Sequence, residues 1–153
     1  GVLEYVQKTP LKTKKESLSK IIKKSLSPMH FHTNITLFPP ENDVIYDCDQ
    51  IKMEIVFGNL LLNSIQAIGT DKGKIIIKIH DTPNTIKIMI HDSGKGVSNE
   101  FIPKMFDPLF TTKQEGTGLG LSCVKNIVEQ HDGTVSIKSC PTIVTITLPK
   151  IIK

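Results

Sequence analysis

The sequence predicts an α+β fold, a two-layer sandwich in which helices cover one face of a mixed, mostly antiparallel sheet. Two observations support this prediction. Segments with helical apolar periodicity and segments typical of strands follow one another in mixed order along the 153 residues. Several strand segments are joined by short turns, as in antiparallel hairpins, and this combination is typical of helices layered on a sheet.

The composition is that of an ordinary globular domain. Hydrophobic residues make up 39% of the chain, which excludes a disordered polymer, and the length suits one domain with a sizeable core. The net charge of +4 is modest and the lysines are scattered along the chain, so we expect no nucleic-acid partner.

Cysteine usage and hydropathy bear on the setting of the protein. The three cysteines, Cys48, Cys123 and Cys140, form no Cys-x-x-Cys pair, which argues against a disulfide framework or a zinc site and fits a reducing, cytoplasmic setting. The longest apolar stretch, Ile51 to Ile68, is interrupted by charged and amide residues and is not expected to span a membrane. The chain begins with Gly1 instead of Met, so we expect it to be a piece of a longer protein whose remainder could be membrane-bound.

The first part of the chain predicts two helical segments and two strands. Gly1 to Pro10 has the pattern of the end of a preceding helix, stopped by proline. Thr13-Lys-Lys-Glu16 has the form of a capping box, and the apolar residues after it predict a helix to about Ser27. Short strands are expected over Asn34 to Phe38 and Asp43 to Cys48.

A long apolar helix is expected from Gln50 to Ile68, capped by Asp49 and ended by Gly69. Its apolar positions leave an amide stripe on one face, made of Asn59, Asn63 and Gln66. Surface amides are common, and a solvated stripe is one interpretation. Asparagine is a mediocre helix former, so two on one face of so apolar a helix favour a ligand role, and an amide carbonyl is a suitable oxygen ligand for Mg²⁺.

Strands and helices also alternate in the second half. Gly73 to His80 and Thr85 to His91 predict a hairpin rich in isoleucine. A short helix is expected near Asn99 to Met105 and a longer one over Leu119 to Gln130. A tight turn separates the two final strands, Thr134 to Lys138 and Ile143 to Leu148.

Asp92-Ser-Gly94-Lys-Gly96 follows the second strand of the hairpin. An ionised carboxylate at a strand end accepts hydrogen bonds and donates none, which suits an exocyclic amino group such as that of adenine. Gly94 and Gly96 lack side chains and let the backbone approach a flat ring closely. Aspartate and glycine are also ordinary turn residues, and a plain turn is the favoured interpretation of this segment taken alone.

Gly116-Thr-Gly118-Leu-Gly120 precedes the helix predicted to end at Gln130. A glycine-rich turn at a helix N-terminus offers free N–H groups and the positive end of the helix dipole to phosphates. These glycines could also form a simple loop, and they match neither a P-loop nor a Rossmann turn. The order of several weak signals therefore carries more weight than any one of them.

Four segments in this order resemble the sequence boxes of sensor histidine kinases. Asn59-Leu-Leu-Leu-Asn63-Ser-Ile-Gln66-Ala67 resembles the N box, and Asp92 to Gly96 resembles the G1 box. Phe106 to Lys113 resembles the F box, and Gly116 to Leu121 resembles the G2 box. These kinases belong to the superfamily shared with gyrase, Hsp90 and MutL, whose Bergerat-type ATP-binding fold is a two-layer sandwich. The resemblance covers roughly Ser17 to Pro149.

The resemblance implies a site for ATP and Mg²⁺. It implies that Asp92 binds adenine and that Asn63 holds Mg²⁺ against the triphosphate. Asn59 and Lys113 are the implied catalytic residues, with Lys113 reaching the terminal phosphate; a solvated surface lysine is the alternative for Lys113. The implied ATP-binding residues are Asn59, Asn63, Gln66, Asp92, Gly94, Gly96, Phe106, Phe110, Thr111, Thr112, Lys113, Gly116, Thr117, Gly118, Leu119 and Gly120.

Two departures from related patterns bear on the reaction. Hydrolysing members of the superfamily carry Glu where this chain has Asn59, and asparagine cannot take a proton from water as a base does. This favours phosphoryl transfer over autonomous ATP hydrolysis. A phosphoacceptor histidine of the family is normally followed by an acidic residue and proline on a dimerisation helix, and none of the five histidines has that setting, so we expect the acceptor outside this chain.

The resemblance therefore implies the catalytic, ATP-binding domain of a two-component sensor histidine kinase. We expect residues 1–12 to be a remnant of a dimerisation helix and linker, 13–150 to be the catalytic domain and 151–153 to be a tail. The implied partners are the kinase's own dimerisation and phosphoacceptor domain, in a homodimer, and the receiver domain of a response regulator, while the fragment itself is expected to be monomeric. Two alternatives are a serine/threonine kinase of the anti-sigma type and a non-catalytic module that senses nucleotide.

Overall fold

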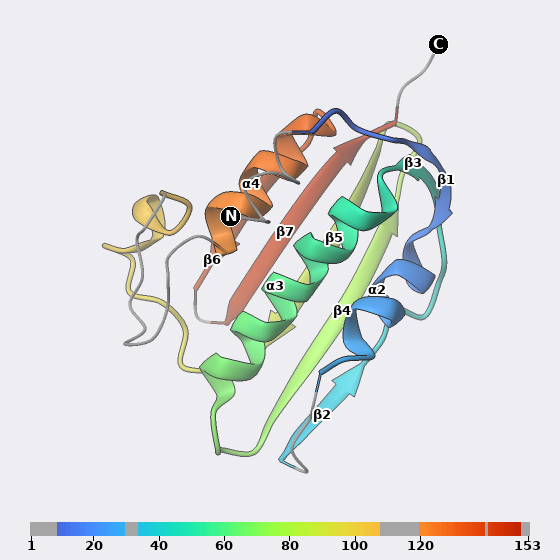
Figure 1. Ribbon diagram of the computed structural model, residues 1–153. Helices are drawn as coiled ribbons and strands as arrows, with labels where there is room; N and C mark the ends of the chain where they lie inside the picture. The colour runs from blue at the N-terminus through green and yellow to red at the C-terminus, as the bar shows by residue number, and fades with distance from the viewer. Residues whose placement is uncertain (1–8, 30–33, 108–119, 140, 151–153) are drawn as a thin grey trace.

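A five-stranded sheet forms one layer of the molecule and α-helices form the other (Figure 1). The structure is a computed structural model that describes residues 9–29, 34–107, 120–139 and 141–150. In spatial order the strands are β2 (Ile35–Phe38), β4 (Gly73–Asp81), β5 (Thr85–Asp92), β7 (Thr142–Pro149) and β6 (Thr134–Lys138). The helices on one face of this sheet are α2 (Leu18–Leu26), α3 (Gln50–Ile68) and α4 (Gly120–Gln130).

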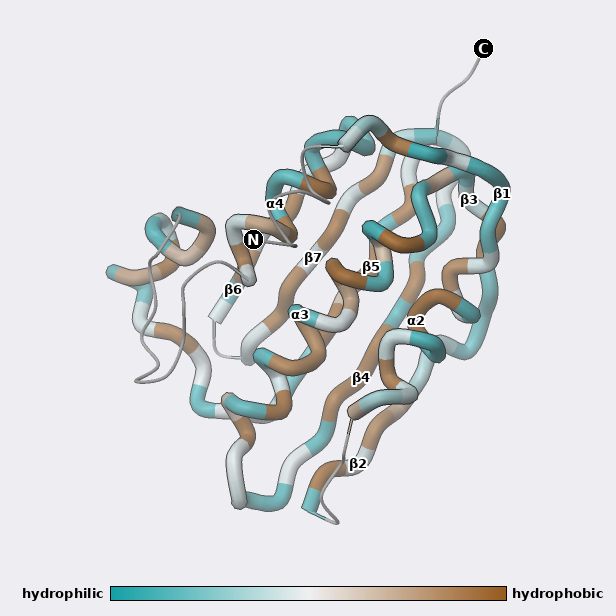
Figure 2. The backbone as a smooth tube through the Cα atoms, viewed as in Figure 1, coloured by the Kyte–Doolittle hydropathy of each residue, from teal (hydrophilic) through white to brown (hydrophobic). Residues whose placement is uncertain are grey.

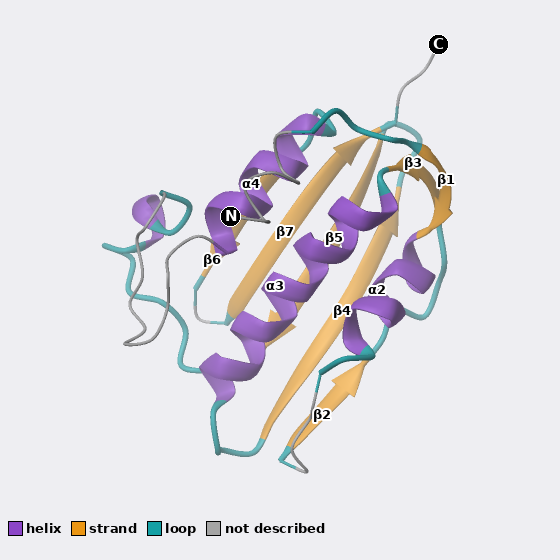
Figure 3. Ribbon diagram, viewed as in Figure 1, coloured by secondary structure: helices purple, strands orange, loops and turns teal. Residues whose placement is uncertain are grey.

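The sheet is mixed and mostly antiparallel, as predicted. Strand β2 runs parallel to β4, and every other neighbouring pair is antiparallel. The predicted hairpin is formed by β4 and β5, and the two final strands β6 and β7 pair as a second one. Figure 3 shows the helices lying over the sheet, and the two-layer α+β sandwich is confirmed.

The core lies between the helices and the sheet. Alternate residues of β4, β5 and β7 face the helices, and Figure 2 shows the hydrophobic colour along much of these strands. Among the described residues, the buried strand side chains include Ile75, Ile77, Ile79, Ile86, Ile88, Ile90, Ile146 and Leu148. The buried side of α3 packs on them with Met53, Val56, Phe57, Leu60 and Leu61.

Helix α3 begins and ends where its sequence predicts. The Asp49 side chain accepts a hydrogen bond from Lys52 N at 3.1 Å and so caps the first turn. Gly69 adopts φ of +64° at the other end, and its N–H donates to Ile65 O at 3.0 Å. A side chain at this position would be strained, which explains why glycine ends the helix.

The predicted capping box at Thr13 to Glu16 is wrong. Residues Lys14–Ser17 form a strand, β1, which pairs with β3 (Ile45–Cys48) in a separate two-stranded sheet. The residue that caps α2 is Ser17, whose hydroxyl accepts a hydrogen bond from Lys20 N at 3.2 Å. Strand pairing therefore overrides the local capping pattern.

Asp43 is predicted to begin a strand, but its carboxylate instead accepts hydrogen bonds at the N-terminus of α2. Its two oxygens accept hydrogen bonds from the Ser17 hydroxyl at 2.6 Å and from Ser19 N at 3.0 Å. These hydrogen bonds hold the pKa of the Asp43 carboxyl below its usual value, and the bond from Ser17 has the largest effect. The strand consequently begins two residues later, at Ile45.

Two other expectations concern helices. The short helix predicted near Asn99 to Met105 is one 3-10 turn, η1 (Ile102–Lys104), which contains Pro103. Residues 1–8 of the helix expected before Pro10 lie outside the described residues. In the described part of the chain, no helix has both the length and the apolar character needed to cross a bilayer.

Candidate functional site

The candidate site is built around Asp92, the last residue of β5, in the middle of the sheet. The strand alternation turns the side chain of Asp92 toward the helix layer, like those of Ile88 and Ile90, and leaves it 6% exposed. Its Oδ1 accepts a hydrogen bond from Gly94 N at 2.9 Å. A carboxylate is thus held at the boundary between the core and the loop that follows.

Burial raises the pKa of the Asp92 carboxyl, because the charged form loses solvation. The hydrogen bond from Gly94 and the side chain of Ser64 act in the opposite direction. Ser64 is itself buried on α3, where its hydroxyl donates to Leu60 O at 3.2 Å. We did not single out Ser64 from the sequence, although a serine within so apolar a helix is a signal that could have been used.

Thr142 is a second residue that the sequence reasoning missed. It lies directly opposite Asp92 on the neighbouring strand β7 and is 8% exposed. Its hydroxyl oxygen is buried and makes no hydrogen bond with any described residue. A buried hydroxyl without a partner costs free energy, so this group is suited to a polar ligand that would also contact the carboxylate.

Gly94 has a packing reason of its own to lack a side chain. A Cβ built on it would lie 2.7 Å from the Cβ of Ala67 and 2.8 Å from the carbonyl carbon of that residue. Lys95 N also donates to Ala67 O at 3.4 Å, so the loop after Asp92 rests on the last turns of α3. Gly96 adopts φ of +78°, a conformation that favours glycine.

The predicted amide stripe lies along α3. Asn59 and Asn63 are partly buried, whereas Gln66 is exposed. The amide nitrogen of Asn59 donates to Ile55 O at 2.8 Å. Its amide oxygen lies beside α4, because a Cβ built on Gly120 would be 3.0 Å from Asn59 Oδ1. The structure therefore brings Asn59 and Gly120 together, because the N-terminus of α4 lies against the middle of α3.

Part of the predicted site lies outside the described residues. This holds for Phe110, Thr111, Thr112, Lys113, Gly116, Thr117, Gly118 and Leu119. Phe106 is described and partly buried, shortly after η1. The loop between Asp92 and η1 is tied to the β6–β7 turn, where Val97 N donates to Ser139 Oγ at 3.1 Å.

The described residues contain no group of three or more His, Cys, Asp or Glu side chains arranged to hold a metal ion. The cysteines Cys48 and Cys123 are buried and free. Burial raises the pKa of the Cys48 thiol to about 12 and also raises that of Cys123, so both stay protonated at neutral pH and neither is a reactive thiolate.

Comparison with known proteins agrees with this architecture. Residues 48–152 match the family described as histidine kinase-, DNA gyrase B- and HSP90-like ATPase. The sensor histidine kinase ZraS of Escherichia coli is 40% identical over 143 residues, which are 90% of this chain and 30% of that protein. The chain thus spans about a third of the length of such relatives.

Two solved structures are similar in fold. The catalytic domain of the histidine kinase ThkA superposes with a TM-score of 0.76 at 28% identity, covering 91% of this chain and 96% of that one. ThkA solved in complex with the response regulator protein TrrA gives a TM-score of 0.75 at 28% identity, covering 98% of this chain and 45% of that one. The chain therefore belongs to the histidine kinase-, DNA gyrase B- and HSP90-like ATPase family, as an ATP-binding domain of the sensor histidine kinase type.

Proposed function

We propose that this domain binds the adenine of ATP between Asp92 and Thr142. The observation that supports this most is a buried carboxylate directly opposite a buried hydroxyl that lacks a partner. An ionised carboxylate accepts a hydrogen bond from the exocyclic amine of adenine, and the hydroxyl can donate to a ring nitrogen beside it. Guanine presents a carbonyl oxygen in place of that amine, so the same carboxylate would repel it.

The triphosphate is proposed to run from this pocket along α3 toward Asn59 and Gly120. The N-terminus of α4 lies against Asn59 there and would face the phosphates with free N–H groups. We propose further contacts with the nucleotide from Phe106 and, at the phosphates, from residues outside the described part, Lys113 and the glycines 116 and 118 among them. Gln66, which is exposed, would contact the nucleotide at the rim of the pocket.

Asn63 is the proposed Mg²⁺ ligand. Its amide oxygen is of the hard type that this ion prefers, and it projects from the same face of α3 as Asn59. The ion would be held jointly by this side chain, waters and phosphates, as is usual for Mg²⁺. When bound, Mg²⁺ would neutralise phosphate charge.

The proposed reaction is transfer of the γ-phosphate to a histidine on a dimerisation domain. The Asn59 amide nitrogen already donates to Ile55 O, and an amide oxygen is no base, so Asn59 would position phosphate and not activate water. Catalysis would consist mainly of positioning and electrostatic stabilisation. This role is supported by relatives that are named sensor histidine kinases, which also disfavour the serine kinase alternative.

We propose that residues 13–150 form the catalytic domain of a cytoplasmic kinase portion, with 1–12 leading from the dimerisation domain and 151–153 as a tail. The whole protein would act as a homodimer and pass its phosphate to the receiver domain of a response regulator. The solved complex of ThkA with a response regulator supports this partner.

The test of the site is the thermal midpoint of the domain with Mg-ADP, with GTP as the base control and Asp92→Asn as the site control. At about 100 times its dissociation constant, ADP should add roughly 2.7 kcal/mol of stability. A shift that is specific for adenine, dependent on Mg²⁺ and lost in Asp92→Asn supports the site. An equal shift with GTP, or an undiminished shift in the variant, would contradict it. Incubating the domain with radiolabelled ATP and the dimerisation domain, with and without its histidine, then tests the acceptor.

A further inference from the structure

The face of the sheet opposite α2, α3 and α4 is strongly and one-sidedly charged. We call this the open face; it consists of the side chains of β2, β4, β5, β6 and β7 that alternate away from the core. Every lysine of these strands lies on it, namely Lys74, Lys78, Lys87 and Lys138, together with His80 and His91. The two carboxylates of the strands, Asp81 and Asp92, belong to the opposite alternation.

The pairing register arranges these residues in rows across the strands. One row runs Phe38, Ile76, His91, Ile143, Lys138, the next runs Lys78, Met89, Thr145, Ser136, and the third runs His80, Lys87, Thr147, Thr134. His80 and Lys87 are direct neighbours, which is unfavourable when both are charged. None of the four lysines forms an ion pair with another described residue, whereas Asp81 is paired with Lys150.

Apolar groups lie between these charges. Phe38 is 47% exposed, and Ile76, Met89 and Ile143 are only partly buried. The ring atom Nε2 of His91 is buried without a hydrogen-bond partner in the described chain. Burial, with the positive charge of Lys78 beside it, lowers the pKa of His91. If this face were only in contact with water, polar residues would be expected at all of its positions. The apolar side chains and the unsatisfied His91 nitrogen are better suited to a surface that another molecule covers.

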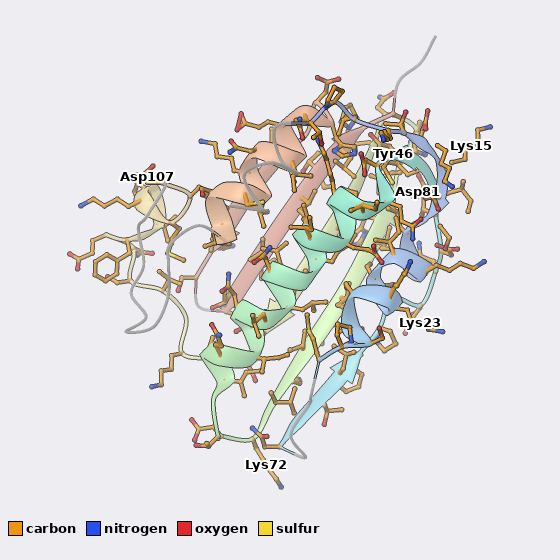
Figure 4. All side chains as sticks on the ribbon, in the orientation of Figure 1. Lys15, Lys23, Tyr46, Lys72, Asp81 and Asp107 are labelled. Atoms are coloured by element: carbon orange, nitrogen blue, oxygen red, sulfur yellow. The ribbon has the colours of Figure 1, made fainter. Side chains whose placement is uncertain are left out.

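A hollow of about 370 Å³ opens at the edge of this face. It is lined by Thr36, Phe38, Lys72, Gly73, Lys74 and Ser93. Figure 4 shows Lys72 at the end of the molecule where β2 and β4 begin. Two ammonium groups and two hydroxyls beside an aromatic ring provide the donors for a carboxylate that is attached to an apolar neighbour.

We propose that the open face is a docking surface for an acidic protein segment, which places one carboxylate side chain in the hollow beside Lys72 and Lys74. Charge complementarity selects an acidic partner, because the strands offer cations on this face and no carboxylate. The rows set cations and apolar groups side by side at strand spacing, about 4.8 Å. A polypeptide that carries both acidic and apolar side chains on one face of an extended segment matches that pattern, whereas a layer of lipid headgroups or a phosphodiester backbone presents mainly charge.

The position of the hollow links this surface to the Asp92 loop. Ser93, which follows Asp92, lines the hollow and accepts a hydrogen bond from Lys74 N at 2.8 Å, while Ser93 N donates to Lys74 O at 3.1 Å. A partner bound in the hollow would therefore contact the loop after Asp92 through Ser93, on the side of the sheet opposite the proposed nucleotide site. The docking surface itself does not depend on the proposed nucleotide site and is tested without nucleotide.

The probe is a synthetic peptide in which Glu and an apolar residue, Leu or Phe, take turns at every second position and so share one face of the extended chain. It is titrated into the isotope-labelled chain at physiological salt and followed by NMR. Saturable shifts on β2, β4 and β5 are expected. The double variant Lys74→Glu, Lys78→Glu should bind at least about tenfold more weakly, which is roughly 1.4 kcal/mol. The matched control is Lys15→Glu, Lys23→Glu, which changes the net charge equally on β1 and α2 (Figure 4) and should bind like the parent.

A second variant, Phe38→Ala, alters no charge and should also weaken binding, because it removes the exposed aromatic ring that lines the hollow. Thermal midpoints of all variants close to that of the parent establish that they are folded. Equal loss in the two charge variants would show unspecific attraction and overturn the proposal, as would the absence of saturable binding. Tighter binding to phosphatidylserine vesicles or to duplex DNA than to the peptide would also overturn it and assign the face to a membrane or to nucleic acid.

Discussion

The two ends of α3 carry polar clusters that differ in how completely their hydrogen bonds are satisfied. At the start of the helix, Lys52 is 2% exposed and donates to Thr9 O and to Gln130 Oε1, the latter at 3.0 Å. Near its end, Asp92 and Thr142 are buried side by side, and the threonine hydroxyl has no partner in the described chain. We refer to these as the Lys52 cluster (Thr9, Asp49, Lys52, Gln130, His131) and the Asp92 cluster (Ser64, Asp92, Gly94, Thr142).

In the Lys52 cluster the side-chain polar atoms of Asp49, Lys52, Gln130 and His131 all have hydrogen-bond partners. Asp49 accepts from Lys52 N and from Lys12 N, the latter at 2.9 Å. Asp49 N donates to His131 Nε2 at 3.1 Å, which fixes the neutral imidazole with its proton on Nδ1, directed at Ile127 O at 2.9 Å. This cluster binds the segment before β1 to α3 and α4. Complete satisfaction marks a structural role, whereas the Asp92 cluster has capacity left for a ligand.

The largest effect on stability is expected from Lys52→Ala. The change leaves Thr9 O and Gln130 Oε1 without their charged donor and removes a fully buried side chain, so the free energy of unfolding should fall by about 2–4 kcal/mol. Urea denaturation measures this loss, and Lys20→Ala, at an exposed position on α2, is the control with an expected change below about 0.5 kcal/mol. Equal small losses in both variants would show that the Lys52 cluster contributes no more to stability than an exposed lysine does.

Gly94→Ala should have the next largest effect, because it forces a methyl group against Ala67. Overpacking of this kind costs about 1–3 kcal/mol, and the shifted loop should also weaken adenine binding. Gly58→Ala, on the helix α3 that also carries Ala67, provides the control, since a Cβ at position 58 would meet nothing nearer than Met29 Cε at 4.0 Å. That variant should be more stable by about 0.5–1 kcal/mol because alanine favours the helix. Thermal melts with and without Mg-ADP separate the two outcomes.

Asp92→Asn should abolish adenine binding and yet not destabilise the fold. The folded pKa of Asp92 is raised above its ordinary value of 3.8, so the folded protein binds this proton more tightly than the unfolded chain does. The resulting stability is present below pH 3.8 and is lost as the pH rises through the folded pKa. The neutral asparagine avoids that loss, so the variant should equal or exceed the parent at neutral pH, and its advantage should shrink on acidification. Denaturation at several pH values would contradict this if the variant were the less stable protein at pH 7.

Thr142→Val should change stability least. It replaces a buried hydroxyl that has no partner by a methyl group of similar size, and we expect a change within about 1 kcal/mol, toward higher stability. Calorimetric titration with Mg-ADP should nevertheless show weaker binding. Thr145→Val, on the open face of the same strand, is the control and should bind the nucleotide like the parent.

The features that could be predicted are those encoded over short distances along the chain. The bounds of α3 follow from Asp49, an apolar periodicity and Gly69, and the position of Asp92 follows from the alternation of β5. Thr142 could not be identified in the same way, because its importance comes from the register that places it opposite Asp92, 50 positions earlier in the chain. The capping box failed for a related reason, since Glu16 pairs across strands with Tyr46. Lys113 and its neighbours remain predictions, as they lie outside the described residues.

The strand order has a consequence for biosynthesis. Strand β7 is the last to leave the ribosome, yet it lies inside the sheet, between β5 and β6. Until it has emerged, β5 presents an unpaired apolar edge and Asp92 has no neighbour on that side, so the nascent chain is open to aggregation. The adenine pocket, as proposed, therefore cannot form before synthesis reaches the end of β7. Chains interrupted earlier would be unable to capture nucleotide and would not compete with the finished domain.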